Sequence, residues 1–201
     1  MSDPSINTFT DLIHGPDGYI QAAAGDEYQI SGSFISSSTQ NSLWDTHSAV
    51  LRFTAGTSTV HLTDITGSDY GPSTAGYVDN FAWDRLMVDS GQSLQLRNGK
   101  MTPGGALYVS SILFADAPAD GTLASYIASH VSNLSSSDAM NIYYDPSQVA
   151  NAYLNDLSYA LGNGGVLAPI SVPEPSIAVM SIGLSVLLLR RRRPRRQTIA
   201  A

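Results

Sequence analysis

The residues best suited to acid–base chemistry in this sequence are a carboxylate and an imidazole two positions apart, Asp45 and His47. If Thr46 between them lies in a β-strand, both side chains point to one face and can form a hydrogen-bonded pair. Such a pair acts in catalysis when it activates a neighbouring nucleophile. No nucleophile motif accompanies it in the sequence, so we favour a solvated surface pair over a catalytic dyad.

The other residues with catalytic potential follow no recognised spacing. His14, His61 and His130 are scattered, and none has a second histidine at the spacing of a zinc-binding helix. There is no Gly-x-Ser-x-Gly motif, and Gly99-Lys100 does not end a phosphate-binding loop because Leu94 replaces the first glycine. The chain has no cysteine, which excludes disulfides and thiolate chemistry. We therefore expect a protein that is not an enzyme.

Calcium is the metal that loop carboxylates of an acidic β-rich protein would bind. Asp64, Asp69 and Asp79 lie in a stretch rich in Gly and Ser. However, the stretch contains neither an Asp-x-Asp-x-Asp-Gly loop nor a repeated Gly-Gly-x-Gly-x-Asp motif. We expect no metal site and no cofactor, and we assign the acidic residues to keeping the surface soluble.

A second kind of chemistry, recognition by a processing enzyme, is indicated near the C-terminus by Val172, Pro173, Glu174, Pro175 and Ser176. The two prolines fix φ and remove two backbone donors, and each pushes the residue before it toward an extended conformation. An extended segment is what a protease-like cleft can grip. The glutamate charge can be read by a basic pocket.

An uncharged segment, residues 177–189, follows this motif. Its large apolar side chains would cover every face of a helix, which favours a membrane environment. They include Ile177, Val179, Ile182, Leu184, Val186, Leu187, Leu188 and Leu189. Thirteen helical residues rise about 20 Å, whereas a bilayer core is about 30 Å thick. The segment is therefore a marginal, provisional anchor, and a buried core helix is the alternative interpretation.

Arginines end the uncharged segment. They are Arg190, Arg191, Arg192, Arg193, Arg195 and Arg196. Because such clusters stay on the cytoplasmic side of a membrane and stop transfer, they place the preceding body outside the cytoplasm. Residues 1–189 carry seventeen acidic and four basic residues, a net charge of −13, which repels nucleic acid. We expect no nucleic-acid partner.

Together, residues 172–196 resemble the PEP-CTERM sorting signal of bacterial envelope proteins. The resemblance implies that an exosortase, a membrane-embedded enzyme similar to a cysteine transpeptidase, recognises residues 173–175 and processes the chain near them. It also implies a transient stay in the inner membrane, followed by the cell envelope or extracellular surface. Family members normally begin with a secretory signal peptide, and residues 1–8 have neither a basic start nor an apolar core. We therefore expect a missing upstream segment.

The body, residues 1–168, is predicted to be mainly β, because short runs of alternating apolar residues are separated by Gly, Ser, Asn and Asp. Changes of phase between Trp83 and Leu86, and between Val109 and Ile112, predict bulges or turns. Residues 145–148, Asp-Pro-Ser-Gln, predict the start of a short helix.

Aromatic residues in the body are expected mostly in the core. Trp83 shares a strand face with Phe81 and is more easily explained by packing than by ligand binding. Tyr143 and Tyr144 are adjacent, so in a strand they face opposite sides and at least one is expected in the core. An exposed aromatic above polar loops would suit stacking on sugar rings.

Two architectures fit the short runs, a right-handed β-solenoid and an antiparallel β-sandwich. Asn98-Gly99 is a good hairpin turn and favours the sandwich, and no strict repeat supports the solenoid. Segments 80–84, 94–96, 105–109, 141–146 and 151–154 are similar to the β-helical, passenger-like modules of PEP-CTERM proteins. That resemblance implies a short right-handed β-helix with one hydrophobic helix at its C-terminus.

The sequence thus predicts a body at 1–168, a linker with the motif at 169–176, a transmembrane-type helix at 177–189 and a basic cytoplasmic tail at 190–201. The expected function is that of an exported cell-envelope or extracellular-matrix protein with a non-catalytic structural or adhesive role. Its expected partners are an exosortase and the inner membrane, with extracellular polysaccharide as a further candidate. The alternative is a secreted polysaccharide hydrolase or lyase on a β-helix scaffold.

Overall fold

A computed structural model shows that the protein is mainly β. The structure describes residues 4–56, 58–100, 104–115, 127 and 130–171. Its compact unit extends from Met1 to Ser171. Eight strands form one sheet, in the spatial order β1-β3-β5-β7-β9-β11-β13-β12. They are β1 (Ile6–Phe9), β3 (Glu27–Ile30), β5 (Thr46–Phe53), β7 (Trp83–Val88), β9 (Ala106–Phe114), β11 (Asn141–Tyr144), β13 (Val166–Pro169) and β12 (Tyr159–Ala160).

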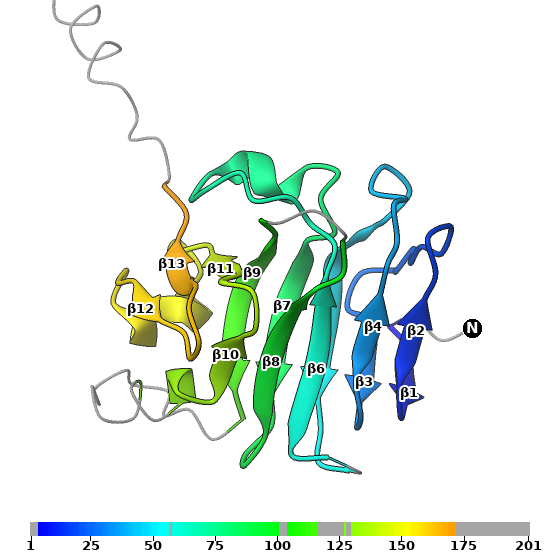
Figure 1. Ribbon diagram of the computed structural model, residues 1–201, viewed down its shortest axis with the longest axis horizontal. Helices are drawn as coiled ribbons and strands as arrows, with labels where there is room; N and C mark the ends of the chain where they lie inside the picture. The colour runs from blue at the N-terminus through cyan, green and yellow to red at the C-terminus, as the bar shows by residue number, and fades with distance from the viewer. Residues whose placement is uncertain (1–3, 57, 101–103, 116–126, 128–129, 172–201) are drawn as a thin grey trace, which may run out of the picture. The chain divides into compact units, whose positions relative to one another are not determined.

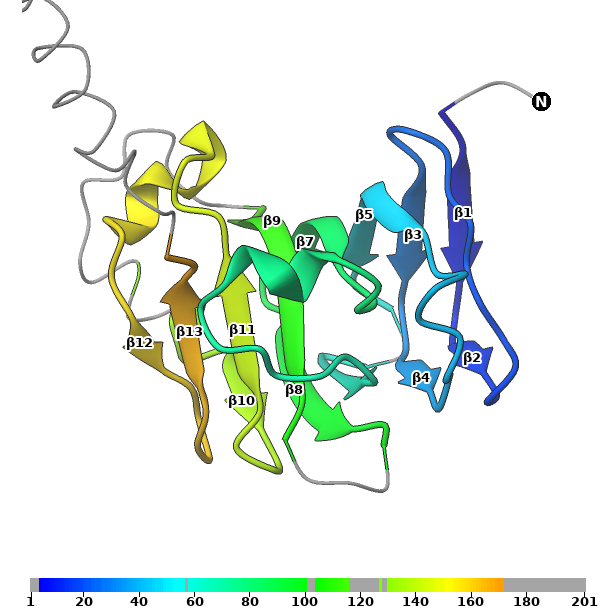
Figure 2. The ribbon, with the colours of Figure 1, turned by 90° about the horizontal axis from the view of Figure 1, so that it is seen from above.

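A second sheet has five strands, in the order β10-β8-β6-β4-β2. They are β2 (Leu12–His14), β4 (Phe34–Ser36), β6 (Val60–Ile65), β8 (Ser93–Asn98) and β10 (Leu134–Ser136). From right to left, Figure 1 shows these five strands in the sequence β2 to β10, and Figure 2 shows the eight-stranded sheet from β1 to β13. From β1 to β11, successive strands alternate between the two sheets.

The pairing between strands is parallel throughout both sheets, except where β12 runs antiparallel to β13. The antiparallel β-sandwich is therefore wrong for the described body. Asn98-Gly99 makes no hairpin, because β8 ends at Asn98 and the next described strand, β9, belongs to the other sheet. Gly99 instead lies close to a neighbouring turn, where an added Cβ would come within 2.4 Å of the Ser36 carbonyl oxygen.

The main core lies between the sheets and is built from residues stacked at equal positions along neighbouring strands. One such row crosses β3, β5, β7 and β9 and consists of Tyr28, Leu51, Leu86 and Ile112. Leu51, Leu86 and Ile112 are fully buried, and burial of each aliphatic side chain stabilises the fold by about 1.5–3 kcal/mol. Stacking of each strand on the next therefore provides the hydrophobic interior.

A smaller apolar cluster covers the opposite face of the eight-stranded sheet. It contains Tyr108 and Tyr143, and Tyr77 from the 3-10 helix η1 (Thr74–Tyr77) packs against it. Tyr144, next in sequence to Tyr143, belongs instead to the main core. The prediction that these two tyrosines face opposite sides is confirmed, as is the burial of Trp83.

The short helix expected from residue 145 starts later, at Val149, and is a 3-10 helix. The structure has a 3-10 helix, η2 (Val149–Leu154), whose first residue Val149 is 90% exposed. The Asp145 carboxylate accepts hydrogen bonds from the backbone nitrogen and hydroxyl of Ser147, at 2.9 and 2.7 Å. These contacts form a local turn ahead of η2, whose own N-cap residue, Gln148, makes no side-chain capping bond.

Candidate functional site

A groove of about 500 Å³ opens where consecutive strands of the five-stranded sheet end. The strands β2, β4, β6 and β8 are parallel, so the segments that follow them leave from the same edge of the sheet. Those segments, with the residues just before β7, line the groove. Most of the lining groups are hydroxyls and amides, supplied by Ser37, Ser38, Thr39, Asn41, Ser68 and Asn80.

Asn80 holds two segments of the groove wall together. Its Oδ1 accepts a hydrogen bond from the Ser68 backbone nitrogen at 2.6 Å, and its Nδ2 donates to the carbonyls of Ser68 and Gly76 at 2.9 and 3.1 Å. The residues on either side, Asp79 and Phe81, have positive φ angles of 47° and 59°. Non-glycine residues adopt this conformation only when surrounding contacts compensate for it. The buried Asn80 side chain supplies such contacts.

The opposite wall is built on the turn after β4. The backbone nitrogen and the hydroxyl of Thr39 both donate to the Pro16 carbonyl, at 2.9 and 3.0 Å. Asn41 Nδ2 donates to the Asp79 carbonyl at 2.9 Å. Hydrogen bonds therefore connect this wall both to the turn after β2, which contains Pro16, and to the segment that contains Asn80.

Tyr70 presents an exposed aromatic ring at the groove, with 53% of its surface accessible. The buried Tyr108 side chain holds the Tyr70 backbone in place, because the Tyr70 nitrogen donates a hydrogen bond to the Tyr108 hydroxyl at 2.8 Å. The same hydroxyl donates to the Gly71 carbonyl at 2.7 Å. Burial raises the pKa of Tyr108 above its ordinary value, so this hydroxyl keeps its proton for the bond to Gly71.

Lys100 supplies the positive charge of the groove, and it is the only lysine in the chain. Its Nζ donates to the Ser68 hydroxyl at 3.1 Å, and its backbone nitrogen donates to Asn98 Oδ1 at 2.8 Å. Burial lowers the pKa of Lys100. Among the ion pairs of the described residues, none involves Lys100. Within the described part of the chain, the ammonium therefore has hydrogen-bond donors that the Ser68 hydroxyl does not use.

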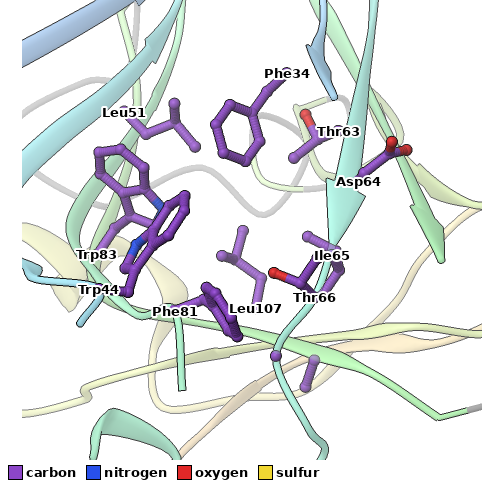
Figure 3. A pocket seen from close by; sticks show the side chains of 12 residues that line it. Phe34, Trp44, Leu51, Thr63, Asp64, Ile65, Thr66, Phe81, Trp83 and Leu107 are labelled. Carbon is purple, nitrogen blue, oxygen red and sulfur yellow. The ribbon is translucent and has the colours of Figure 1, made fainter. Parts of the chain in front are cut away.

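A second hollow lies inside the main core and is much smaller, about 10 Å³. Figure 3 shows Phe34, Trp44 and Trp83 around it, with the Asp64 carboxylate directed away from the rings. Such a space is the size of a single water molecule. The buried Thr63 hydroxyl lines it and has no hydrogen-bond partner within the described part of the chain. This hollow is a packing feature and is too small for an organic ligand.

The structure does bring Asp45 and His47 together, with 3.4 Å between Asp45 Oδ1 and His47 Nδ1. The other ring nitrogen, Nε2, contacts the backbone carbonyl of Tyr77. Because both nitrogens face oxygen acceptors within the protein, the imidazole ties β5 to η1. Its geometry is that of a structural contact, and the Asp45 side chain is well exposed.

Of the three aspartates considered for calcium, Asp64 and Asp69 are engaged in separate contacts. Asp64 pairs with Arg97, whose Nη2 lies 2.7 Å from Asp64 Oδ1. Asp69 accepts from Gly71 N and from Asn141 Nδ2, both at 2.7 Å. In the regions that the structure describes, no three potential ligand side chains are grouped as a metal site.

Two further histidines, His14 and His61, lie on strands of the five-stranded sheet, whereas His130 packs against Phe114 with ring centroids 5.1 Å apart. His61 is fully buried, with Nδ1 2.5 Å from the Gly32 carbonyl and Nε2 3.1 Å from Gln92 Oε1. His14 packs edge-on against Trp44, and burial lowers its pKa. His61 is thus part of the packed interior, and His14 is half-buried at its edge.

The predicted sorting and membrane residues, 172–176, 177–189 and 190–196, lie outside the described residues. Among the residues that the structure describes, no helix has the length and apolar character needed to span a membrane. The compact unit ends at Ser171, one residue before the predicted motif. Its end is held by a hydrogen bond from the Ser171 nitrogen to the Pro72 carbonyl, at 2.7 Å.

Comparison with known proteins yields no match of any kind: no family model, no curated protein and no solved structure is similar to this chain at a significant level.

Sequence reasoning missed the groove because its residues come from five separate segments, none of which carries a local motif. In the sequence, Gly99-Lys100 pointed only to a phosphate-binding loop, which the absence of the first glycine excludes. One signal was present: a single lysine in an acidic chain, at a corner between strands. The groove becomes visible only when the register brings the turns after β2, β4, β6 and β8 to one edge.

Proposed function

We propose that this chain is an exported envelope or extracellular-matrix protein whose C-terminal PEP-CTERM signal is recognised and processed by an exosortase. In this proposal the body is a short right-handed β-solenoid with a non-catalytic, adhesive role toward extracellular polysaccharide. Parallel strands that alternate between two stacked sheets support the solenoid.

The observation that carries the sorting proposal is the position of the boundary. The compact unit ends at Ser171, and the Pro-Glu-Pro motif begins two residues later. Cleavage near residues 173–175 would therefore remove the uncharged segment and the arginines without removing any strand of the body. A processing signal needs this arrangement, because a folded product must survive the cut.

The adhesive role is supported by the groove rather than by the carboxylates. The groove presents hydroxyl, amide, ammonium and aromatic groups on a rigid edge of the sheet. In contrast, Asp45, Asp64 and Asp69 are each held in different local contacts. Polar groups on a rigid frame suit binding of a hydroxylated polymer.

The sorting proposal is tested with the full chain carrying a secretory signal peptide, expressed in a host that has an exosortase. We expect the parent chain to lose its arginines, as shown by the mass of the mature C-terminus. Replacement of Pro173, Glu174 and Pro175 by Ala should leave the arginines in place and hold the chain in the inner membrane. Pro146→Ala, in the body, is the matched control and should behave as the parent. Identical C-termini for the parent and the triple variant would refute the proposal.

The non-catalytic part is tested by assaying cleavage of polysaccharides by the purified chain. We expect no activity above background. Single Asp→Asn substitutions at positions 45, 64, 69, 79 and 84 provide the decisive comparison. An activity that one of them abolishes would establish the hydrolase or lyase alternative and overturn the adhesive role.

A further inference from the structure

We propose that the groove binds an acidic saccharide, with a ligand carboxylate on the Lys100 ammonium and a sugar ring against Tyr70. This inference rests on the proposed adhesive function and narrows its ligand to sugars that carry isolated carboxylates.

The environment of Lys100 favours a ligand that carries an anionic group. Its side chain is partly withdrawn from water, yet its only side-chain hydrogen bond within the described residues is to the neutral Ser68 hydroxyl. An ammonium has three donors, and withdrawal of a charge from water is costly unless an opposite charge or further acceptors compensate. A ligand carboxylate supplies both the charge and the acceptors, through charge-assisted hydrogen bonds.

The remaining groove groups favour a sugar over a simple anion. Thr39, Asn41 and Ser68 present hydroxyl or amide groups, which match the donor and acceptor character of sugar hydroxyls. The exposed Tyr70 ring offers a flat apolar surface for the C–H face of a pyranose. A phosphate site would be expected to use several cations or backbone donors, whereas the groove has one ammonium. A volume of about 500 Å³ is within the range of small-ligand sites.

The charge of the rest of the body limits how anionic the ligand can be. Residues 1–171 contain sixteen acidic and four basic residues. This negative field repels a densely charged polyanion over distances up to the Debye length, about 10 Å at 0.1 M salt. A chain of mostly neutral sugars with occasional uronic acids avoids that repulsion and still supplies a carboxylate to Lys100.

Binding is measured by calorimetry with the full chain purified in mild detergent. The probes are tri- and tetrasaccharides that contain one glucuronate, galacturonate or mannuronate unit, each paired with its carboxyl-reduced neutral form. We expect at least one acidic probe to bind about tenfold or more tightly than its neutral pair, as a charge-assisted contact predicts. Lys100→Met should abolish this preference, and Lys100→Arg should retain part of it.

The aromatic contact is tested with a matched pair of exposed tyrosines. Tyr70→Ala should weaken binding of both the acidic and the neutral probe. Tyr19→Ala should not, because Tyr19 is also exposed, at 47%, and does not line the groove. Fluorescence of the two buried tryptophans, Trp44 and Trp83, reports whether each variant has folded.

The single lysine provides a second readout. Reductive methylation modifies only Lys100 and the N-terminal amine, and peptide mass mapping separates them. The acidic probe should protect Lys100 and leave the N-terminus unprotected. Equal affinity for acidic and neutral probes, absence of binding by all acidic probes, or a preference that survives Lys100→Met would overturn the inference. Binding is measured with purified protein, so a failure of the sorting experiment does not affect this result. A chain that is sorted but does not bind the acidic probes would refute only the inference about the ligand.

Discussion

The Tyr108 hydroxyl lies 2.8 Å from the backbone nitrogen of Tyr70 and thereby links the eight-stranded sheet to the loop that forms one side of the groove. Tyr108 belongs to β9, whose position is fixed by the ladders with β7 and β11. The ring stacks on Tyr143 of β11, with centroids 5.0 Å apart. The exposed ring of Tyr70 is thus placed by a buried side chain thirty-eight positions later in the sequence.

Removal of this hydroxyl should therefore affect both stability and the groove. Tyr108→Phe leaves the Tyr70 nitrogen and the Gly71 carbonyl without their partner, which should cost about 1–3 kcal/mol in the free energy of unfolding. Urea denaturation measures this cost. Tyr19→Phe, at an exposed position, is the control and should have no effect. A Tyr108→Phe chain as stable as the parent would show that the bonded hydroxyl does not hold the loop.

Among the glycines that the structure describes, Gly76 in η1 leaves the least room for a side chain. A Cβ added there would lie 1.9 Å from the Tyr108 ring. Gly76→Ala should therefore displace η1 from the sheet and destabilise the fold by about 1–3 kcal/mol, the usual cost of overpacking. Gly15→Ala is the matched control, because nothing lies within 4 Å of its added Cβ. Equal thermal stability of the two variants would contradict this packing of η1.

The body's β character and much of its core followed from the sequence, since alternation of apolar residues reports which side chains face inward. The changes of phase also have a structural basis. Trp83 pairs with Val109 and Leu86 pairs with Ile112, and all four belong to the main core. The three-residue spacing thus occurs at matching positions on β7 and β9, so their ladder keeps its register. On the other side of β7, the ladder with β5 has a register shift between Thr46 and Val50, as a bulge would produce.

The repeat could not be found because the distance between stacked positions varies. Glu27 follows its partner Ile6 by 21 residues, whereas Arg85 follows its partner Val50 by 35. The additional residues include the segment that forms η1 and contains Asn80. Loops of this kind lengthen one turn of the chain without changing the strands, so the irregular segments that create the groove are also those that conceal the period.

Two buried threonines provide a matched test of hydrogen bonding in the core. Thr46 Oγ1 accepts from Trp44 Nε1 at 2.9 Å and contacts the Ala82 carbonyl, whereas Thr63 Oγ1 has no partner among the described residues. Thr46→Val should cost about 1–3 kcal/mol, because it leaves buried polar groups unpaired, and Thr63→Val should cost close to nothing or stabilise the fold. Denaturation curves of both variants measure the difference. A larger loss for Thr63→Val would indicate that a bound water satisfies its hydroxyl.

Asp26 should make stability depend on acidic pH. Hydrogen bonds from the backbone nitrogen and hydroxyl of Ser5, and from the Ala23 nitrogen, lower the pKa of Asp26 below its ordinary 3.8. The unfolded chain therefore binds the proton more tightly, so this contribution to stability is complete above the unfolded-state pKa and is lost as pH falls through the folded-state value. Asp26→Asn should be less stable than the parent at neutral pH, and the difference should disappear in acid.

The control for Asp26→Asn is the exposed Asp17, whose replacement by Asn should leave the pH profile of the denaturation midpoint as in the parent. A constant difference between the parent and Asp26→Asn across the acidic range would show that the three bonds do not favour the ionised carboxylate.

Lys100 permits the most direct test of the groove, because labelling with 13Cε-lysine gives one resonance for the whole chain. Burial lowers the pKa of Lys100, so its titration midpoint should lie below that of the same residue in urea-unfolded chain. As pH rises, the folded chain loses this proton before the unfolded chain does. The free energy of unfolding therefore increases with pH between the folded-state and the unfolded-state pKa of Lys100. An acidic saccharide on the ammonium should raise the midpoint, and its carboxyl-reduced form should not. Coincident midpoints in folded and unfolded chains would show that the ammonium is fully solvated and has no need of a carboxylate.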